Sequence, residues 1–237
     1  MWNLKIEFDK LEQASEFINK LRNIKKIEYH IEKKNNQISV NGDNEFSREL
    51  ILEIISESIV NIYKTEFFNQ NIGLSFLPQQ HKDALIKALV MFDIESDIYY
   101  VLTSIERFST VILSSFNEFL LTKIKHRWQE FVLIANLNGN YLLNYEVFIE
   151  FLKFLINSIQ PKTRVVNLKS DLKKFLLFDE KNNLVTSRVD LSDEMGLITN
   201  LVLLAPKNIN IHCIDKVSEK TFKTLYYLFD KKINLLV

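Results

Sequence analysis

The sequence predicts an α+β fold, with a mainly helical middle flanked by mixed α/β ends that contain short strands. Near both ends of the chain, apolar residues alternate with polar ones, which is the period of a strand with one buried face. In the middle, apolar residues recur every three or four positions, as in an amphipathic helix. These patterns divide the chain into a small β-α-β-β unit over residues 1–44, a helical region over 45–160 and a mixed α/β region over 161–237.

The β-α-β-β unit is predicted from four short patterns. Apolar residues alternate over residues 2–8, which predicts a strand, and take helical spacing over residues 10–23. Shorter alternations predict two more strands at residues 27–31 and 38–40. The strands of the two chain ends pair either in one sheet, which would join this unit and the mixed region in one compact domain, or in two sheets.

The helical region opens with a long helix that starts near Ser47 and has isoleucines along one face. A short helix follows, and Asp97 is expected to cap the helix after it. From Thr110 onward the helical pattern continues. Residues 136–140 are predicted to form a loop, and a last helix ends near Gln160.

In the mixed region, one block predicts a helix that leads directly into a strand. The apolar stretch from Leu197 stops at Pro206, which cannot continue a helix and biases Ala205 toward extended geometry. Alternation over residues 209–214 then predicts a strand. The other elements predicted here are strands at residues 164–168, 172–178 and 233–237 and a helix at 218–229.

The composition favours a soluble cytoplasmic protein. Lys plus Arg and Asp plus Glu both number 30, so binding to nucleic acid or to a membrane through net charge is not expected. Cys213 is the only cysteine, which excludes an intramolecular disulfide and fits a reducing compartment. No signal peptide is visible, and the apolar run Leu197–Ala205 is far shorter than the ~20 residues of a membrane span.

The sequence predicts no catalytic residue, cofactor or metal site. The four histidines are not at metal-ligand spacing, and no phosphate-binding loop or nucleophile motif occurs. His212 and Cys213 are neighbours on a predicted strand, so their side chains point to opposite faces and structural roles are favoured.

The densest acidic cluster contains Asp190, Asp193 and Glu194. An enzyme would use such carboxylates for acid–base chemistry or to hold a divalent metal. The cluster precedes a predicted helix, however, where acidic residues oppose the positive end of the helix dipole. Capping of that helix by Ser192 or Asp193 is therefore the favoured interpretation.

The densest basic run surrounds Lys123, Arg127 and Trp128. Lys123 and Arg127 are four residues apart on one helix face, and Trp128 follows directly. Phosphate contacts by the basic side chains and base stacking on the indole would make this face a nucleic-acid contact. The alternative is a solvated basic face with Trp128 in the core.

Two stretches of the chain carry a family resemblance. Tyr145–Ile149, continued by Phe151–Ile156 and Gln160–Lys162, is similar to the phrase EYxEFIxLLxYFVxxQ followed by basic residues. Leu197–Pro206 and the strand behind it are similar to the phrase LxxALITLAPxxIIIH. Through these phrases the chain resembles the YtxC-like sporulation proteins of spore-forming Firmicutes over residues 110–237.

The chain departs from the family's FxxFRLxxY phrase, because Leu120 stands in place of the arginine and Ile124 in place of the tyrosine. If that arginine is functional in the family, this chain has lost the function or is a distant relative. The resemblance implies a role in sporulation and a cytoplasmic setting, and it supplies no catalytic residues.

Three hypotheses about function follow. The leading one is a non-enzymatic, sporulation-associated cytoplasmic protein that acts through contacts with a protein partner. The first alternative is a nucleic-acid-binding module that uses the basic face around Lys123–Arg127. The second alternative is an enzyme with a carboxylate site. The sequence leaves the partner and the oligomeric state open.

Overall fold

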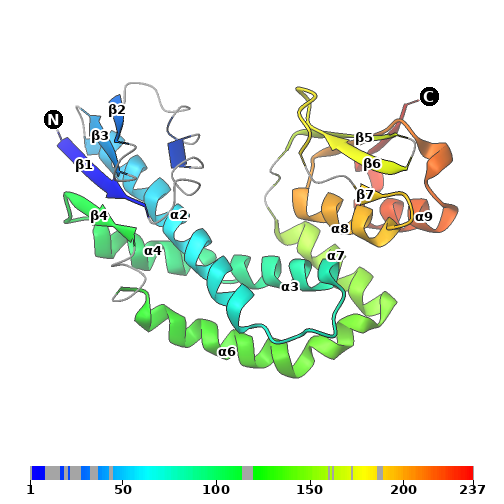
Figure 1. The fold of residues 1–237 in the computed structure, drawn as a ribbon, viewed down its shortest axis with the longest axis horizontal. Helices are drawn as coiled ribbons and strands as arrows, with labels where there is room; N and C mark the ends of the chain where they lie inside the picture. The colour runs from blue at the N-terminus through cyan, green and yellow to red at the C-terminus, as the bar shows by residue number, and fades with distance from the viewer. Residues whose placement is uncertain are drawn as a thin grey trace. The chain divides into compact units, whose positions relative to one another are not determined.

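Contacts divide the chain into two units, each assembled from two separate stretches (Figure 1). Unit 1 contains Met1–Gly73 and Leu89–Asn136, and unit 2 contains Leu74–Ala88 and Leu137–Val237. This division differs from the domain boundaries at residues 44 and 160 that the sequence predicts. Two helices contribute residues to both units. The structure, a computed structural model, describes residues 2–8, 17–18, 21, 28–32, 37–42, 45–113, 120–159, 161, 163–171, 173–185 and 189–236.

Four strands form the sheet of unit 1, in the order β2-β3-β1-β4. β1 (Trp2–Glu7), β2 (Glu28–Glu32) and β3 (Gln37–Gly42) are antiparallel neighbours and confirm the three strands predicted from alternation. The helix predicted over residues 10–23 falls outside the described residues, except for Phe17, Ile18 and Leu21, which are helical.

The fourth strand corrects the sequence prediction. β4 (Thr110–Ile112) pairs in parallel with β1, so the helix predicted from Thr110 does not start there. Lys5 N–H donates to the carbonyl of Ser109, and Val111 is buried. Three residues are too few to display a period of two, so the strand is defined by its pairing. The predicted helical positions Phe116 and Phe119 lie outside the described residues.

Three helices supply most of the core of unit 1. They are α2 (Glu45–Asn71), α4 (Ile94–Ile105) and α6 (Thr122–Asn138), the last ending in unit 2. α2 is the predicted long helix, and its stripe Ile51, Ile55 and Ile59 is fully buried. Each such side chain contributes about 1.5–3 kcal/mol by burial, which overrides the low helix propensity of isoleucine.

The loop predicted at residues 136–140 is wrong. α6 continues to Asn138, and a 3₁₀ helix, η3 (Gly139–Leu143), follows. The Asn136 side chain binds backbone instead of breaking the helix, because its Oδ1 accepts from Gly73 N–H at 3.0 Å and its Nδ2 donates to the Asn71 carbonyl at 3.4 Å. α3 (Gln79–Met91) is the predicted short helix and also contributes to both units.

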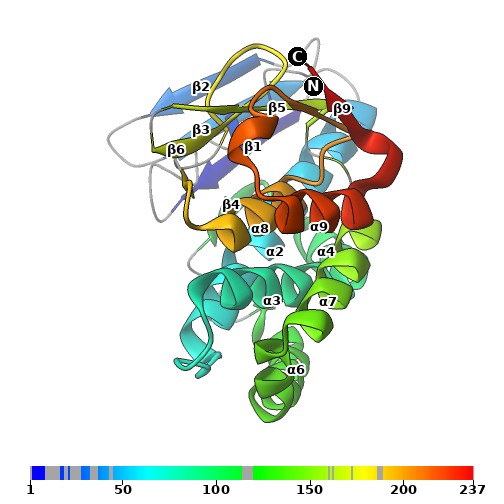
Figure 2. The same cartoon turned by 90° about the vertical axis from the view of Figure 1, so that its right-hand side faces the viewer.

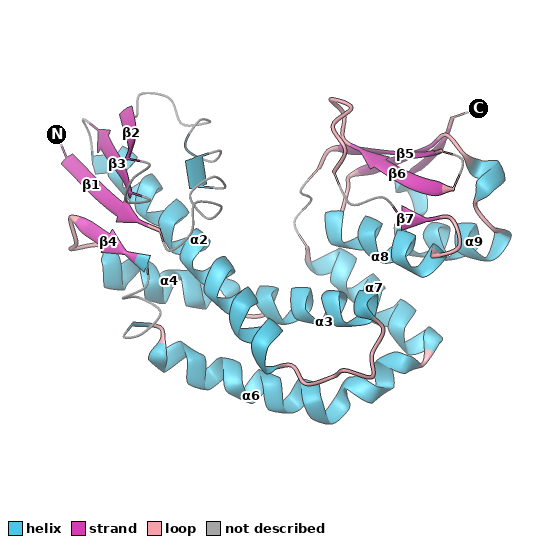
Figure 3. Cartoon of the chain, in the orientation of Figure 1, coloured by secondary structure: helices cyan, strands magenta, loops and turns pink. Residues whose placement is uncertain are grey.

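Unit 2 has its own sheet, in the order β7-β6-β5-β8-β9. Figure 3 shows β5, β6 and β7 of this sheet in magenta. The two chain ends therefore contribute to two sheets, which resolves the alternative that the sequence left open. β5, β8 and β9 are parallel, whereas β6 is antiparallel to both β5 and β7. The bounds are β5 (Val165–Ser170), β6 (Lys174–Phe178), β7 (Val189–Asp190), β8 (Asn208–Ile211) and β9 (Ile233–Leu235).

Helices cover one face of this sheet. α8 (Glu194–Leu204) and α9 (Glu219–Phe229) lie on the same side in Figures 1 and 2. α7 (Tyr145–Ser158) packs against both helices. Short 3₁₀ helices, η4 (Ile214–Lys216) and η5 (Asp230–Lys232), flank α9. The buried strand residues are Val166, Leu168, Phe175, Leu177, Val189, Ile209 and Ile211.

The predicted helix-to-strand block is confirmed, with one correction at its turn. Ala205 is left-handed, with φ 44°, rather than extended, and its N–H bonds the carbonyls of Leu201 and Val202. Ala205 is therefore the C-cap of α8, and Pro206 separates this helix from β8. Within the described ranges, no helix has the length and hydropathy needed to cross a bilayer.

Candidate functional site

A buried carboxylate joins three helices of unit 1. Asp97 of α4 is fully buried, and its Oδ2 accepts from Lys64 Nζ of α2 at 2.7 Å and from Trp128 Nε1 of α6 at 2.9 Å. Its Oδ1 accepts from the guanidinium of Arg127. We call Lys64, Asp97, Arg127 and Trp128 the ion cluster.

Lys64 shows how strongly the site is desolvated. Its ammonium has no exposed area, and besides Asp97 it donates to the Phe92 carbonyl at 2.6 Å. Burial lowers the pKa of Lys64, and the hydrogen bond from Lys64 to Asp97 opposes that shift. A buried ammonium with two strong acceptors is held in its charged form by those partners.

Arg127 links the ion cluster to the surface. Its Nη1 lies 3.0 Å from Asp93 Oδ2, and its side chain is 34% exposed. Asp93 precedes α4 in the left-handed conformation, with φ 54°, and makes no side-chain capping bond. Asp97, predicted as the cap, lies in the first turn of α4 instead, where its carboxylate pairs with the buried Lys64 and the partly exposed Arg127.

The ion cluster connects α2, α4 and α6 through one carboxylate and so has a structural role. The carboxylate of Asp97 has three donors, which occupy three of its roughly four lone-pair sites. Breaking such a buried pair on one side leaves an uncompensated charge, so each member depends on the others. Lys64 could not be identified from the sequence, because the side chain of a lysine in a helix usually lies at the surface.

The basic face predicted for nucleic acid does not form one surface. Lys123 is exposed, Arg127 is bound to Asp93 and Asp97, and Trp128 has no exposed area. As placed, the indole cannot stack on a base, and the alternative with Trp128 in the core describes the structure. The physical reason is Asp97, which draws the indole N–H and the guanidinium to one carboxylate.

The acidic cluster stabilises local backbone. Asp193 caps α8, as predicted, by accepting from Gly196 N–H at 2.8 Å, and it also accepts from Gln80 Nε2 at 2.9 Å. Asp190 Oδ1 accepts from the N–H and the hydroxyl of Ser192, and these hydrogen bonds lower its pKa. Within the described residues, no group of three His, Cys, Asp or Glu side chains is placed to hold a metal.

Hydrogen bonds to Glu194 connect α8 to the start of α9. It accepts from the N–H and the hydroxyl of Ser218, at 3.1 and 2.8 Å, and from the Thr221 hydroxyl at 2.5 Å. Burial raises the pKa of Glu194, but the hydrogen bonds from Thr221 and Ser218 outweigh it, and the pKa lies below its usual value. Ser218 in turn caps α9.

The histidines and the cysteine of unit 2 have separate surroundings. His212 is exposed, whereas Cys213 is buried, and burial raises the pKa of its thiol. His81 is 8% exposed and stacks on Phe148 with ring centroids 3.6 Å apart. Its Nδ1 has no partner among the described residues, and burial lowers the pKa of the ring.

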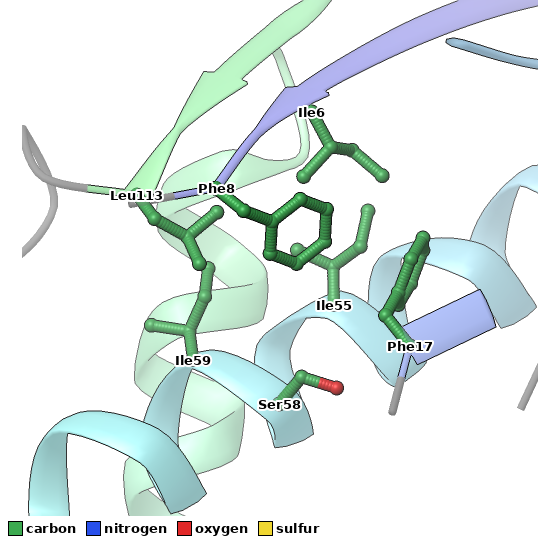
Figure 4. Close-up of a pocket in the computed structure, with 7 residues that line it drawn as sticks. All are labelled: Ile6, Phe8, Phe17, Ile55, Ser58, Ile59 and Leu113. Atoms are coloured by element: carbon green, nitrogen blue, oxygen red, sulfur yellow. The ribbon is translucent and has the colours of Figure 1, made fainter. Parts of the chain in front are cut away.

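A small apolar pocket lies in unit 1 between the sheet and α2 (Figure 4). Ser58 is its one polar lining residue, and the Ser58 hydroxyl donates to the Ile54 carbonyl at 2.8 Å. The space between the side chains does not admit a water molecule. The pocket is therefore part of the hydrophobic core. Its lining residues are Ile6, Phe8, Phe17, Ile55, Ser58, Ile59 and Leu113.

Exposed apolar side chains follow one side of α7. Val147 and Phe154 are 43% and 64% exposed. Their spacing of seven residues places them on one helix face, together with the half-buried Phe151, four residues after Val147. We call these three residues the α7 stripe. Large apolar side chains grouped in this way are typical of a protein-binding surface.

The α7 stripe is bordered by polar side chains in fixed positions. Tyr227 of α9 donates its hydroxyl to Glu150 Oε1 at 2.5 Å, and Lys153 Nζ lies 3.6 Å from the centre of the Tyr227 ring. An apolar centre with an ordered polar rim is the usual anatomy of an interface.

No protein-family model matches the chain, and neither a curated protein nor a solved structure matches it.

Proposed function

We propose that this chain is a binding protein that acts in the cytoplasm during sporulation through contact with a protein partner. The sporulation role and the cytoplasmic setting rest on the resemblance of Tyr145–Ile149 and Leu197–Pro206 to the YtxC-like phrases. The contact with a partner rests on the α7 stripe, where Phe154 is 64% exposed within an apolar helix face.

Covering the exposed apolar side chains of this face removes them from water, which lowers their free energy. Each fully buried side chain of this size gains about 1.5–3 kcal/mol on leaving water, so covering the α7 stripe favours association. The partner that fits is a protein with an apolar groove, because a helix with anchors four and seven residues apart binds such grooves. The remaining ionisable groups of the ion cluster and the acidic cluster are engaged in structural hydrogen bonds.

The test is quantitative co-purification from sporulating cells. A double variant, Val147→Asp and Phe154→Asp, introduces two charges into the α7 stripe and is expected to reduce recovery of the partner roughly tenfold or more. The matched control is Tyr99→Asp on α4, since Tyr99 is an exposed aromatic residue, 69% exposed, outside the stripe.

Support requires the same protein to be lost with the double variant and retained with the control. Equal recovery of every co-purified protein in both variants contradicts the proposed contact. Normal sporulation of a strain that lacks the chain contradicts the proposed setting.

A further inference from the structure

Figures 1 and 2 show α8 and α9 on one side of the unit 2 sheet. On the other face, four strands contribute a row of side chains. Phe178 of β6, Asn167 of β5, Asn210 of β8 and Asn234 of β9 are register partners in that order. Neighbouring strands are about 4.8 Å apart, so the row is about 14 Å long. We call these four residues the amide row.

Hydrogen bonds connect the three asparagines in series. Asn210 Nδ2 donates to Asn167 Oδ1 at 3.0 Å, and Asn234 Nδ2 donates to Asn210 Oδ1 at 3.2 Å. Asn167 Nδ2 donates to the Asp179 carbonyl at 3.3 Å, which anchors the series at the β6 end. The carboxamides are therefore oriented by one another before any ligand arrives.

The amide row retains hydrogen-bonding capacity. A carboxamide offers two N–H donors and an oxygen with two lone pairs. Within the described hydrogen bonds, Asn210 uses one donor and one lone pair, and Asn234 uses one donor. The unused donors and acceptors lie at the half-buried to exposed surface of the sheet, where a ligand can reach them.

Lys169 and His212 lie beside the amide row. Lys169 of β5 is the next outward residue after Asn167, and its Nζ lies 5.2 Å from the centre of the Phe178 ring. His212 Nε2 lies 3.3 Å from Asn167 Oδ1. The nearby carboxylate of Asp179 is occupied by the N–H groups of the turn that follows it.

The charge of the whole chain conceals a difference between its units. Unit 2 contains 16 Lys and Arg against 12 Asp and Glu, a net charge of +4. Unit 1 contains 14 Lys and Arg against 18 Asp and Glu, a net charge of −4. The expectation that zero net charge disfavours an anionic partner therefore does not extend to unit 2.

We propose that the amide row and Lys169 bind single-stranded nucleic acid. Carboxamides pair with base edges in two-point contacts, the Phe178 ring offers a surface for base stacking, and lysine contacts phosphate. An open sheet of this width holds about two or three bases in sheet-based RNA-binding modules. Unpaired bases fit, since a duplex stacks the faces of its bases and pairs their Watson–Crick edges, both of which a single strand exposes.

The test is fluorescence anisotropy of the full chain with labelled oligouridine and oligothymidine of about 12 nucleotides and with a hairpin duplex. We expect both single strands to bind more tightly than the duplex and to weaken as salt rises. A preference between the two strands distinguishes RNA from DNA. Phe178→Ala is expected to weaken binding about tenfold.

Charge variants make the test specific. Lys169→Gln is expected to weaken binding and to reduce the slope of log affinity against log salt by about 0.7. The matched control is Lys223→Gln on α9, which removes the same charge from the same unit at a lysine 73% exposed and paired with Glu219. Asn234→Asp, at the exposed end of the amide row, places a negative charge against the phosphates and should weaken binding about tenfold or more.

The proposal is overturned if no single strand binds at about 50 mM salt, or if the duplex binds equally well. Equal weakening by Lys169→Gln and Lys223→Gln also overturns it. Because Phe178→Ala can disturb folding, Asn234→Asp decides independently: unchanged affinity in a variant with an unchanged circular dichroism spectrum overturns the proposal. These measurements use purified protein, so they are independent of the co-purification test of the α7 stripe.

Discussion

The two units contain similar polar side chains and use them in opposite ways. In unit 1, Asp97 lies in the core with three donors, whereas the buried Nε of Arg127 has no hydrogen-bond partner among the described residues. In unit 2, Asn210 and Asn234 stand on the outer face of a sheet with donors and acceptors to spare. The difference teaches that burial decides which polar groups must be paired, because an unpaired group in the core lacks water to satisfy it.

The largest expected effect comes from removing the centre of the ion cluster. Asp97→Ala leaves Lys64 buried without its counter-ion, so unit 1 should lose about 3–5 kcal/mol of unfolding free energy. Urea denaturation followed by tryptophan fluorescence measures this selectively, since both tryptophans, Trp2 and Trp128, belong to unit 1.

The control for this prediction is a double variant, Lys64→Met with Asp97→Ala, which removes both charges. It should be more stable than Asp97→Ala alone, because no uncompensated ammonium remains in the core. If the single and double variants unfold at the same urea concentration, the ion cluster does not behave as a coupled unit.

A smaller effect is expected from an aspartate at a helix end in unit 2. Asp193→Ala removes the cap of α8 and should lower stability by about 1 kcal/mol, because the Gly196 N–H loses its acceptor. Asp193→Asn keeps an acceptor and should lose less. Thermal unfolding followed by circular dichroism compares the three proteins. A loss as large as that of Asp97→Ala would erase the distinction between the two units.

A pH effect of moderate size is expected at His81. Burial lowers the pKa of folded His81 below the ~6.5 of an unfolded histidine, so the unfolded chain takes up the proton first as pH falls. This contribution to stability is complete above pH ~6.5 and decreases below it, by at most about 1.4 kcal/mol per pH unit. Hydrogen exchange of α3 and α7 between neutral and mildly acidic pH measures the change.

His81→Phe keeps a ring against Phe148 and removes the titrating group. The opening free energy derived from its hydrogen exchange, after correction for the intrinsic pH dependence of exchange, should therefore no longer change with pH in this window. The carboxylates of Asp190 and Glu194 have lowered pKa values, so their stabilising contributions disappear only in more acidic solution. Their loss therefore does not overlap with the pH window of His81. An unchanged pH dependence in His81→Phe would assign the effect to another group.

The smallest effect is expected at Lys123. This side chain is exposed on α6, so Lys123→Gln should change stability by no more than about 0.5 kcal/mol. It should also leave any binding of single strands unchanged, in contrast to Lys169→Gln. Anisotropy titrations of the two variants side by side provide the measurement. If Lys123→Gln loses as much affinity as Lys169→Gln, the basic face of α6 contacts the nucleic acid.

Periodicity predicted most elements because burial imposes it. The alternation of β1 and the isoleucine stripe of α2 repeat often enough to be recognised. β4 has three residues, and its place beside β1 comes from pairing with a segment about a hundred residues away in sequence. Asn136 illustrates the same limit, since its tertiary hydrogen bonds keep α6 helical where composition favours a loop.

The candidate sites were less predictable than the fold. Asp97 has the sequence position of a cap, and only the approach of Lys64, 33 residues earlier, makes it a buried counter-ion. The amide row combines Asn167, Asn210 and Asn234 from three strands, and their register is set by backbone pairing. One signal was present in the sequence: asparagine occupies outward positions of two successive predicted strands. The cap at Asp193 was predictable, because capping is a local interaction.

The route of the chain through unit 2 has a consequence for biosynthesis. Leu74–Ala88 belongs to this unit, yet the remainder of the unit begins only at Leu137. On the ribosome this segment emerges with Gln80 and His81 well before Asp193 and Phe148, to which they bind in the finished protein. Unit 2 therefore cannot complete its folding as a nascent N-terminal domain would, and a fragment that starts at Leu137 lacks a piece of its own structure.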